Sequence, residues 1–391
     1  MAARRAVEED CSHWLWWDVR VEPFVIEVSD GALDDLRERI HRTRWPTPAP
    51  GVPWAQGTDL GYLRDLLAYW ADGFDWRARE QWLNRFQHRV ADVDGVRIHF
   101  VHRRGADGAV PLVLTHGWPS TFVELLSLVD RLGDRFDLVV PSLPGYAFSQ
   151  RPTRVGVDRA FVAELWHQLM QGLGYERYGA HGGDFGAGVA THMALSQPER
   201  VIGIHLSTSE MWPYAGPGSP PLTIEEQAYV DHVARWDETE RGYSSVQSTR
   251  PQTLGYGLND SPAGLAAWVL EKWRSWSDSG GDLDARFGRD YLLTMLTVWW
   301  VTESITSSMR DYYDNRWHGR PMGPSDFVEV PTAIAVFANE FVPEGEPPRS
   351  WYERLYNIRR WTVHPRGGHF AAAEEPDLLA HDIAEFFADL R

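Results

Sequence analysis

Asp184 lies in the segment of the chain with the sharpest chemical pattern. Residues 181–186 read His-Gly-Gly-Asp-Phe-Gly, directly after an apolar run and directly before a helical stretch. A strand, a tight turn and a helix in this order form a nucleophile elbow, where glycines two residues before and two after the central residue permit the close backbone approach that the turn demands. A carboxylate there is ionised at neutral pH and can attack an electrophilic carbon without a base. An ordinary helix N-cap can show the same pattern, so the motif alone leaves both interpretations open.

A second pattern, His-Gly-Trp-Pro at residues 116–119, directly follows the apolar run 112–115. In folds with a nucleophile elbow, the loop after a neighbouring strand supplies one backbone N–H of an oxyanion hole, and the residue after the nucleophile supplies the other. The two donors would then be the backbone N–H groups of Trp118 and Phe185. A Gly-Trp-Pro turn can also be purely structural, so this interpretation depends on the first motif.

A candidate general base, His369, stands late in the chain. It lies in Gly-Gly-His-Phe at residues 367–370, a turn after the last predicted strand and before the helical stretch 376–390. In folds with such an elbow, the histidine follows the nucleophile and the acid in chain order. We therefore favour His369 as the base and interpret the nearby His364, which is followed by Pro365, as structural.

The acid that would orient this histidine should follow a strand between the elbow and His369. Glu340 fits, because it comes directly after the apolar run 335–339. Glu344 and Glu346 stand in the same loop and are alternatives, but they lie farther from the strand end, in a Pro/Gly stretch typical of a solvated loop.

Short apolar runs that alternate with helical stretches must position these groups. The alternation predicts a mostly parallel sheet covered by helices on both faces. It gives way to Trp- and Tyr-rich helical stretches, among them 263–276 and 291–313, which indicate a helical cap inserted between strands. We predict four parts: a helical N-terminal region 1–92, a first core part 93–211, the cap 212–324 and a second core part 325–391. The predicted strands cover residues 97–102, 111–115, 138–141, 177–181, 201–206, 332–338 and 361–363.

Composition excludes several classes of protein. The 391 residues carry a net charge of −17, which disfavours nucleic acid and anionic membranes as partners. One cysteine, Cys11, excludes an internal disulfide framework and a thiolate metal cluster. We find no metal-ligand spacing, no secretory signal and no run of about 20 apolar residues, so we expect a soluble cytoplasmic protein without a metal. Lys272 is the single lysine among 38 Lys and Arg residues.

Taken together, the motifs resemble the microsomal-type epoxide hydrolases, which include juvenile hormone epoxide hydrolases and bacterial relatives from enediyne antibiotic pathways. The resemblance begins near Pro23 and also rests on three further segments, residues 74–77, 260–265 and 374–376. It implies an α/β-hydrolase fold with a helical cap insertion and an N-terminal helical extension. It also implies an Asp-His-Glu triad of Asp184, His369 and Glu340. The sequence departs from the family at the N-terminus, where we expect no counterpart of the mammalian members' membrane anchor.

The resemblance further implies that two cap tyrosines bind the epoxide oxygen. They fall on Tyr243 and Tyr312, with Tyr313 as the alternative for the second. Tryptophans of the cap could line a pocket for flat substrates, although aromatic residues at helical spacing more often form core. These tryptophans are Trp268, Trp273, Trp276, Trp299 and Trp300.

The expected reaction converts an aromatic or bulky epoxide to a vicinal diol through an alkyl ester on Asp184, with no cofactor. A serine would instead form an ether, which water cannot remove, so an aspartate suits this chemistry. The nearest alternative is a haloalkane dehalogenase, for which Trp118 would also fit but the paired tyrosines would not be needed. A non-catalytic binding protein of the same fold is a further alternative. The expected partners are the small-molecule epoxide and, as a homodimer, a second copy of the chain.

Overall fold

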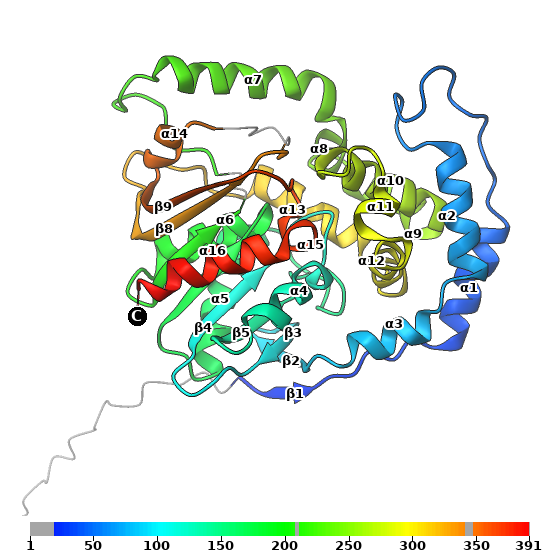
Figure 1. Ribbon diagram of the computed structural model, residues 1–391, viewed down its shortest axis with the longest axis horizontal. Coiled ribbons are helices and arrows are strands. Elements are labelled where there is room, and N and C mark those ends of the chain that lie inside the picture. Colours follow the sequence, from blue (N-terminus) through cyan, green and yellow to red (C-terminus); the bar gives the residue numbers. More distant parts are fainter. Residues whose placement is uncertain (1–18, 208–210, 341–346, 391) are drawn as a thin grey trace, which may run out of the picture.

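A twisted nine-stranded sheet forms the centre of the computed structural model, which describes residues 19–207, 211–340 and 347–390 (Figure 1). Its strands follow the order β1-β2-β3-β5-β4-β6-β7-β8-β9. The pairs from β5 to β9 are parallel, whereas β1, β2 and β3 form an antiparallel edge. The strands are β1 Val21–Pro23, β2 His88–Val93, β3 Val96–Arg103, β4 Val110–Thr115, β5 Phe136–Pro141, β6 Tyr178–Gly182, β7 Val201–Leu206, β8 Val328–Phe337 and β9 Tyr356–His364.

Helices cover both faces of the parallel part, as the alternating pattern predicted (Figure 1). One face carries α4 Phe122–Leu132, α15 Ala371–Glu374 and α16 Pro376–Ala388, and the other carries α5 Arg159–Gly172 and α6 Phe185–Ser196. The central strand β4 is therefore enclosed on both sides, and its residues Leu112, Val113 and Leu114 are fully buried. This burial explains why the strand reads as a continuous apolar run rather than an alternating one.

The antiparallel edge differs from the sequence expectation, which placed only helices before residue 93. Besides α1 Asp30–His41, α2 Leu60–Asp72 and α3 Trp76–Leu83, this region contributes β1 and most of β2. A two-residue turn joins β2 to β3, with Asp94 and Gly95 both at positive φ. An Asp-Gly pair is a strong signal for such a hairpin, so the turn could have revealed the strand before it.

The chain segment that connects β7 to β8 forms a set of helices, the cap, which lies beside α1 and α2 (Figure 1). The expected helix over 291–313 is two helices, because the chain turns at residues 302–304, where Glu303 has a φ of 48°. The helices of this stretch are α7 Ile224–Glu240, α8 Gly242–Gln247, α9 Pro251–Asp260, α10 Pro262–Trp276, α11 Leu283–Phe287, α12 Arg289–Val301 and α13 Ile305–Trp317, and α14 Arg349–Glu353 follows β8.

Hydrogen bonds fix the N-terminal helices against the cap. Trp70 of α2 donates its indole N–H to the Thr297 hydroxyl at 2.9 Å, and the Arg79 guanidinium of α3 donates to the Thr294 hydroxyl at the same distance. Both hydroxyls belong to α12, so the N-terminal region holds a cap helix from outside.

Candidate active site

The backbone at Asp184 makes the sharp turn that the elbow motif predicted. Asp184 lies between β6 and α6 with a φ of 54° and a ψ of −128°, a strained conformation for a residue other than glycine. A Cβ at Gly186 would clash with the Thr115 carbonyl oxygen of β4, and one at Gly182 would clash with the backbone of Gly186. Glycine is therefore required at both positions for the turn to sit against the sheet.

The Asp184 carboxylate accepts hydrogen bonds from the two predicted oxyanion-hole donors. Its Oδ1 accepts from the backbone N–H of Trp118 at 2.9 Å and from that of Phe185 at 2.6 Å. His116 anchors the peptide that carries the first donor. Its Nε2 accepts from the Leu143 N–H at 3.2 Å, and its Nδ1 donates to the Gly117 carbonyl oxygen at 3.1 Å. Burial lowers the pKa of His116 to about 4, so this ring is neutral and available as an acceptor.

The predicted triad residues come together in a buried cluster. His369, on the loop after β9, has Nε2 at 3.4 Å from Asp184 Oδ2 and Nδ1 at 3.1 Å from Glu340 Oε1. Glu340 follows β8, and the exposed fractions of Asp184, His369 and Glu340 are 4%, 7% and 9%. The competing Glu344 and Glu346 lie outside the described residues. His364 ends β9 and stacks on Phe337 at 4.7 Å, which agrees with a structural role.

Electrostatics couple Asp184 and His369. Burial by itself lowers the pKa of His369, but the charge of Glu340 and the hydrogen bonds with both carboxylates outweigh burial and raise the pKa well above its usual value. Burial pushes the pKa of Asp184 up, yet its hydrogen bonds hold that pKa below its usual value. The resting pair is therefore a carboxylate beside an imidazolium.

Two cap tyrosines pack against Trp118, whose backbone N–H binds Asp184. The Tyr243 ring of α8 stacks on Trp118 at 5.5 Å, and the Tyr312 ring of α13 meets Trp118 edge-on at 5.6 Å. The two tyrosine rings lie 5.8 Å apart. Tyr313 instead contacts Trp317 and His318 of its own helix, so of the two candidates only Tyr312 faces the site.

The cap tryptophans do not act alike. Trp276 meets the rings of Tyr243 at 5.2 Å and His369 at 5.1 Å, so it borders the site. Trp273 stacks on Phe370 at 3.9 Å and Trp299 contacts Tyr146, so both are fully buried where the cap packs on the core.

The structure also brings in Glu124, a residue that the motifs did not indicate. Glu124 lies in the first turn of α4, and burial raises its pKa to about 7. With Ser120, Asp184 and His369 it lines a cavity of about 20 Å³, room for one water molecule. Acidic residues are common in first helical turns, so nothing in the sequence distinguished this one.

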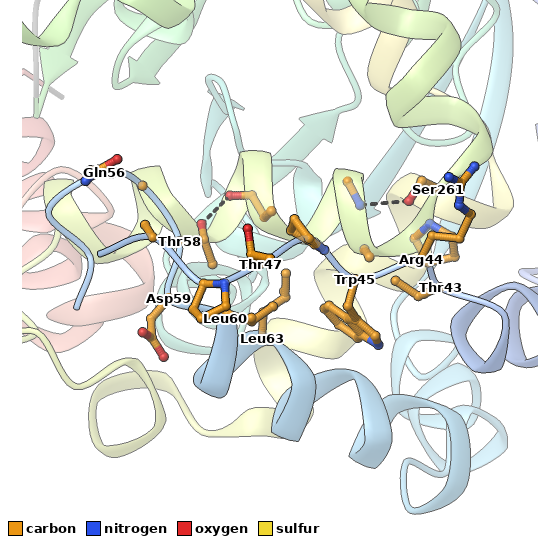
Figure 2. Close-up of a pocket in the computed structure, with 18 of the residues that line it drawn as sticks. Thr43, Arg44, Trp45, Thr47, Gln56, Thr58, Asp59, Leu60, Leu63 and Ser261 are labelled. Atoms are coloured by element: carbon orange, nitrogen blue, oxygen red, sulfur yellow. Dashed lines mark hydrogen bonds between the residues drawn. The ribbon is translucent and has the colours of Figure 1, made fainter. Parts of the chain in front are cut away.

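A much larger groove, of about 870 Å³, lies elsewhere (Figure 2). It runs between the loop 42–59 and the start of α10, where Thr58 donates to the Ala267 carbonyl oxygen at 2.7 Å. Trp45, Leu63 and Ser261 line it, and none of the predicted site residues does. The groove is therefore separate from the buried cluster.

A carboxylate at the elbow, an acid after β8 and a histidine after β9, all beneath a helical cap, define an α/β-hydrolase with aspartate at the nucleophile position. Comparison with known proteins identifies the family. The family model described as "Epoxide hydrolase N terminus" matches residues 21–125, and that described as "alpha/beta hydrolase fold" matches residues 110–243. The chain belongs to the microsomal-type epoxide hydrolases, as its motifs suggested, and is an epoxide hydrolase.

The similarity extends over nearly the whole chain. The "Putative epoxide hydrolase" of Stigmatella aurantiaca is 39% identical over 383 residues, covering 95% of this chain and 86% of its own length. Epoxide hydrolase 1 of Sus scrofa is 32% identical, covering 95% and 91%. The crystal structure of juvenile hormone epoxide hydrolase from Bombyx mori superposes with a TM-score of 0.85 at 31% identity, covering 96% of this chain and 95% of that one. These matches confirm the predicted fold class.

Among the described residues, no helix combines the length and apolarity needed to cross a membrane. Across the same residues, no three His, Cys, Asp or Glu side chains gather in a way that could hold a metal ion.

Proposed function

We propose that the protein opens epoxides through a covalent ester on Asp184. The observation that carries the proposal is the difference between its two carboxylate oxygens. Oδ1 is bound by the N–H groups of Trp118 and Phe185, whereas Oδ2 lies beside His369. Oδ2 forms a bond to an epoxide carbon, the carbon–oxygen bond of the ring breaks, and its electron pair moves to the epoxide oxygen.

A proton for that oxygen comes from the cap. Tyr243 and Tyr312 face Trp118 above the carboxylate, and a phenol can donate both a hydrogen bond and a proton to the developing alkoxide. Their aromatic surroundings, including Trp118 and Trp276, also support an aromatic or bulky substrate. Turnover of styrene oxide compared with an aliphatic terminal epoxide measures this preference.

Ester formation converts His369 into a base. In the resting site two carboxylates favour its protonated form. Esterification makes Asp184 neutral, which removes one of these charges and lowers the pKa of the imidazole. The proton that leaves His369 returns to the tyrosine that protonated the alkoxide. His369, oriented by Glu340, then takes a proton from water, whose oxygen bonds to the ester carbonyl carbon while charge develops on Oδ1 in the oxyanion hole. The bond between that carbon and Oδ2 then breaks, and Oδ2 leaves as a hydroxyl of the diol with the proton that His369 holds. The oxygen from water completes the Asp184 carboxyl group, whose proton passes to His369 and restores the resting pair.

Trapping the ester tests this sequence of steps. In His369→Gln the carboxylate can still attack but no group activates water, so the ester should accumulate. Intact-protein mass spectrometry after incubation with styrene oxide should show one added substrate mass, on the peptide that contains Asp184. Asp184→Ala is the matched control and should show none. A folded, substrate-binding His369→Gln protein that stays unmodified would contradict the covalent mechanism.

The haloalkane dehalogenase alternative has one observation in its favour. The buried indole N–H of Trp118 has no hydrogen-bond partner among the described residues. A donor that binds halide would also be unpaired before the substrate enters. A chloride-release assay with a chloroalkane decides between the two reactions, and we expect no release.

The biological setting is also proposed. The resemblance to enediyne-pathway enzymes and the strong preference for arginine over lysine support a role in bacterial natural-product biosynthesis. The acidic composition and the single cysteine support a cytoplasmic location. A homodimer stays a prediction.

A further inference from the structure

Lys272 occupies an unusual place for the single lysine of an arginine-rich chain. It lies in α10 and is 7% exposed, with its Nζ 4.7 Å from the centroid of the Tyr243 ring and 5.7 Å from that of Trp276. All other Lys and Arg positions are arginine, including those whose guanidinium groups lie over aromatic rings, such as Arg79 over Trp82. A compact ammonium ion on a flexible stem differs from a planar guanidinium in size and hydration, so the exception indicates a local requirement.

The ammonium group faces the ring of a proposed proton donor. A cation over an aromatic face interacts favourably with the ring, and it interacts more favourably still when the ring gains negative charge. Tyr243 gains such charge as its phenol gives a proton to the alkoxide. Because Lys272 and Tyr243 are both buried, water screens this interaction little.

The ion pair of Lys272 supports this arrangement. Its Nζ lies 2.6 Å from Glu271 Oε2, and the Glu271 side chain is 26% exposed whereas that of Lys272 is 8% exposed. The carboxylate is therefore the better hydrated partner, while the ammonium is the one placed over the ring. Glu271 also fixes the orientation of the lysine side chain.

We infer that Lys272 is a positioning residue for ring opening, which acts through Tyr243 by stabilising the negative charge that develops on its ring. This inference rests on the proposed function, because it assigns Tyr243 as a proton donor. It concerns only the first half-reaction. Hydrolysis of the Asp184 ester uses His369 and the oxyanion hole, so it should not depend on Lys272.

Charge and shape can be separated by substitution. Lys272→Met keeps an unbranched apolar stem and removes the charge, whereas Lys272→Arg keeps the charge. Arg274→Gln is a matched control, since it also removes a cation of α10 that lies over an aromatic ring, that of Trp54 at 4.6 Å, but outside the site. All three are made in the His369→Gln background, where the rate of ester formation is read directly by quenched-flow mass spectrometry.

We expect Lys272→Met to slow ester formation roughly tenfold or more. Lys272→Arg, which keeps the charge but not the compact ammonium, should slow it clearly less, and Arg274→Gln should leave it unchanged. A second readout compares 1,2-epoxypropane with its 3,3,3-trifluoro analogue. The trifluoromethyl group stabilises the alkoxide, so the loss caused by Lys272→Met should shrink for that substrate, which a purely structural defect would not produce. Lys272→Gln replaces the methionine variant if the latter fails to fold.

The outcomes distinguish this inference from the proposed function. If His369→Gln with Lys272 intact forms no ester, the proposed function is wrong. If that ester forms and Lys272→Met forms it equally fast, the inference about Lys272 is wrong. Equal losses in the methionine and arginine variants, or an equal loss with both epoxides, would show that Lys272 contributes shape rather than charge.

Discussion

Tyr243 and Tyr312 both pack against Trp118, whereas Tyr313 points elsewhere although it is next to Tyr312 in the chain. Successive residues of a helix point about 100° apart, so only one of them can face Asp184. Tyr312 contacts Trp118 and also Phe185, at 4.9 Å, and the backbone N–H groups of both residues bind Asp184 Oδ1. The proposed proton donor therefore packs against the two residues that hold the proposed nucleophile.

Removal of single hydroxyl groups tests these roles. Tyr243→Phe and Tyr312→Phe should each slow ring opening roughly 10²-fold, because a positioned proton donor is lost while ring packing is kept. Rapid-mixing tryptophan fluorescence with styrene oxide measures this step, since Trp118 contacts both rings. Tyr313→Phe is the control and should behave as wild type. A large loss in Tyr313→Phe with none in Tyr312→Phe would reverse the assignment.

The site residues that could be predicted from the sequence are those that lie in short motifs. The turns around Asp184, Trp118 and His369 require particular residues at fixed spacing, so local sequence sufficed to predict that they come together. Glu124 and Lys272 reach the site only through the tertiary packing of α4 and α10, and no local pattern distinguishes them from ordinary helix residues.

The sharp turn at Asp184 depends on the close packing of α6 against β4. A Cβ at Gly186 would meet the carbonyl groups of Thr115 and His116, and backbone atoms cannot rotate out of the way as a side chain can. The end of β4 that packs against α6 is also the end that is followed by Trp118 in the chain. Packing at Gly186 and the geometry of the oxyanion hole are therefore linked.

Gly186→Ala should reduce both stability and activity. Overpacking of this kind lowers the free energy of unfolding by about 1–3 kcal/mol, and a shift of Thr115 displaces the Trp118 donor. Gly257→Ala is a matched control on the exposed face of α9, where an added Cβ meets nothing within 4 Å, and should raise the free energy of unfolding by about 0.5–1 kcal/mol. Urea denaturation and steady-state turnover measure the two effects. A Gly186→Ala protein as active and stable as wild type would show that the elbow tolerates a side chain.

Elements could be predicted where the sequence carries one clear pattern. The buried parallel strands are continuous apolar runs, and α10 is a helical stretch rich in tryptophan. The strands β1 and β2 were missed because β1 is three residues long and β2 has no clear alternation. The break between α12 and α13 was missed because its turn, at Thr302-Glu303-Ser304, lacks glycine or proline.

Across the whole molecule, buried ionisable groups make stability depend on pH in two opposing ways. Burial lowers the pKa of several histidines, to about 4 for His102, His116 and His192. The unfolded chain binds more protons than the folded one between that value and the ordinary histidine pKa, so these groups raise the free energy of unfolding as pH increases through this window. Buried Glu124 and Glu374 act in the opposite direction, because burial raises the pKa of each to about 7.

The contribution of Glu124 can be isolated by comparing wild type with Glu124→Gln. The folded protein keeps Glu124 protonated up to about pH 7, whereas the unfolded chain loses this proton near 4.5, so wild type loses stability between these values. Glutamine has no such loss. The free energy of unfolding of Glu124→Gln minus that of wild type should therefore rise from pH 4 to pH 8, by up to about 3 kcal/mol. Urea denaturation across this range measures the difference, in which the histidine contributions cancel. A difference that stays constant with pH would mean that Glu124 is already ionised in the folded protein.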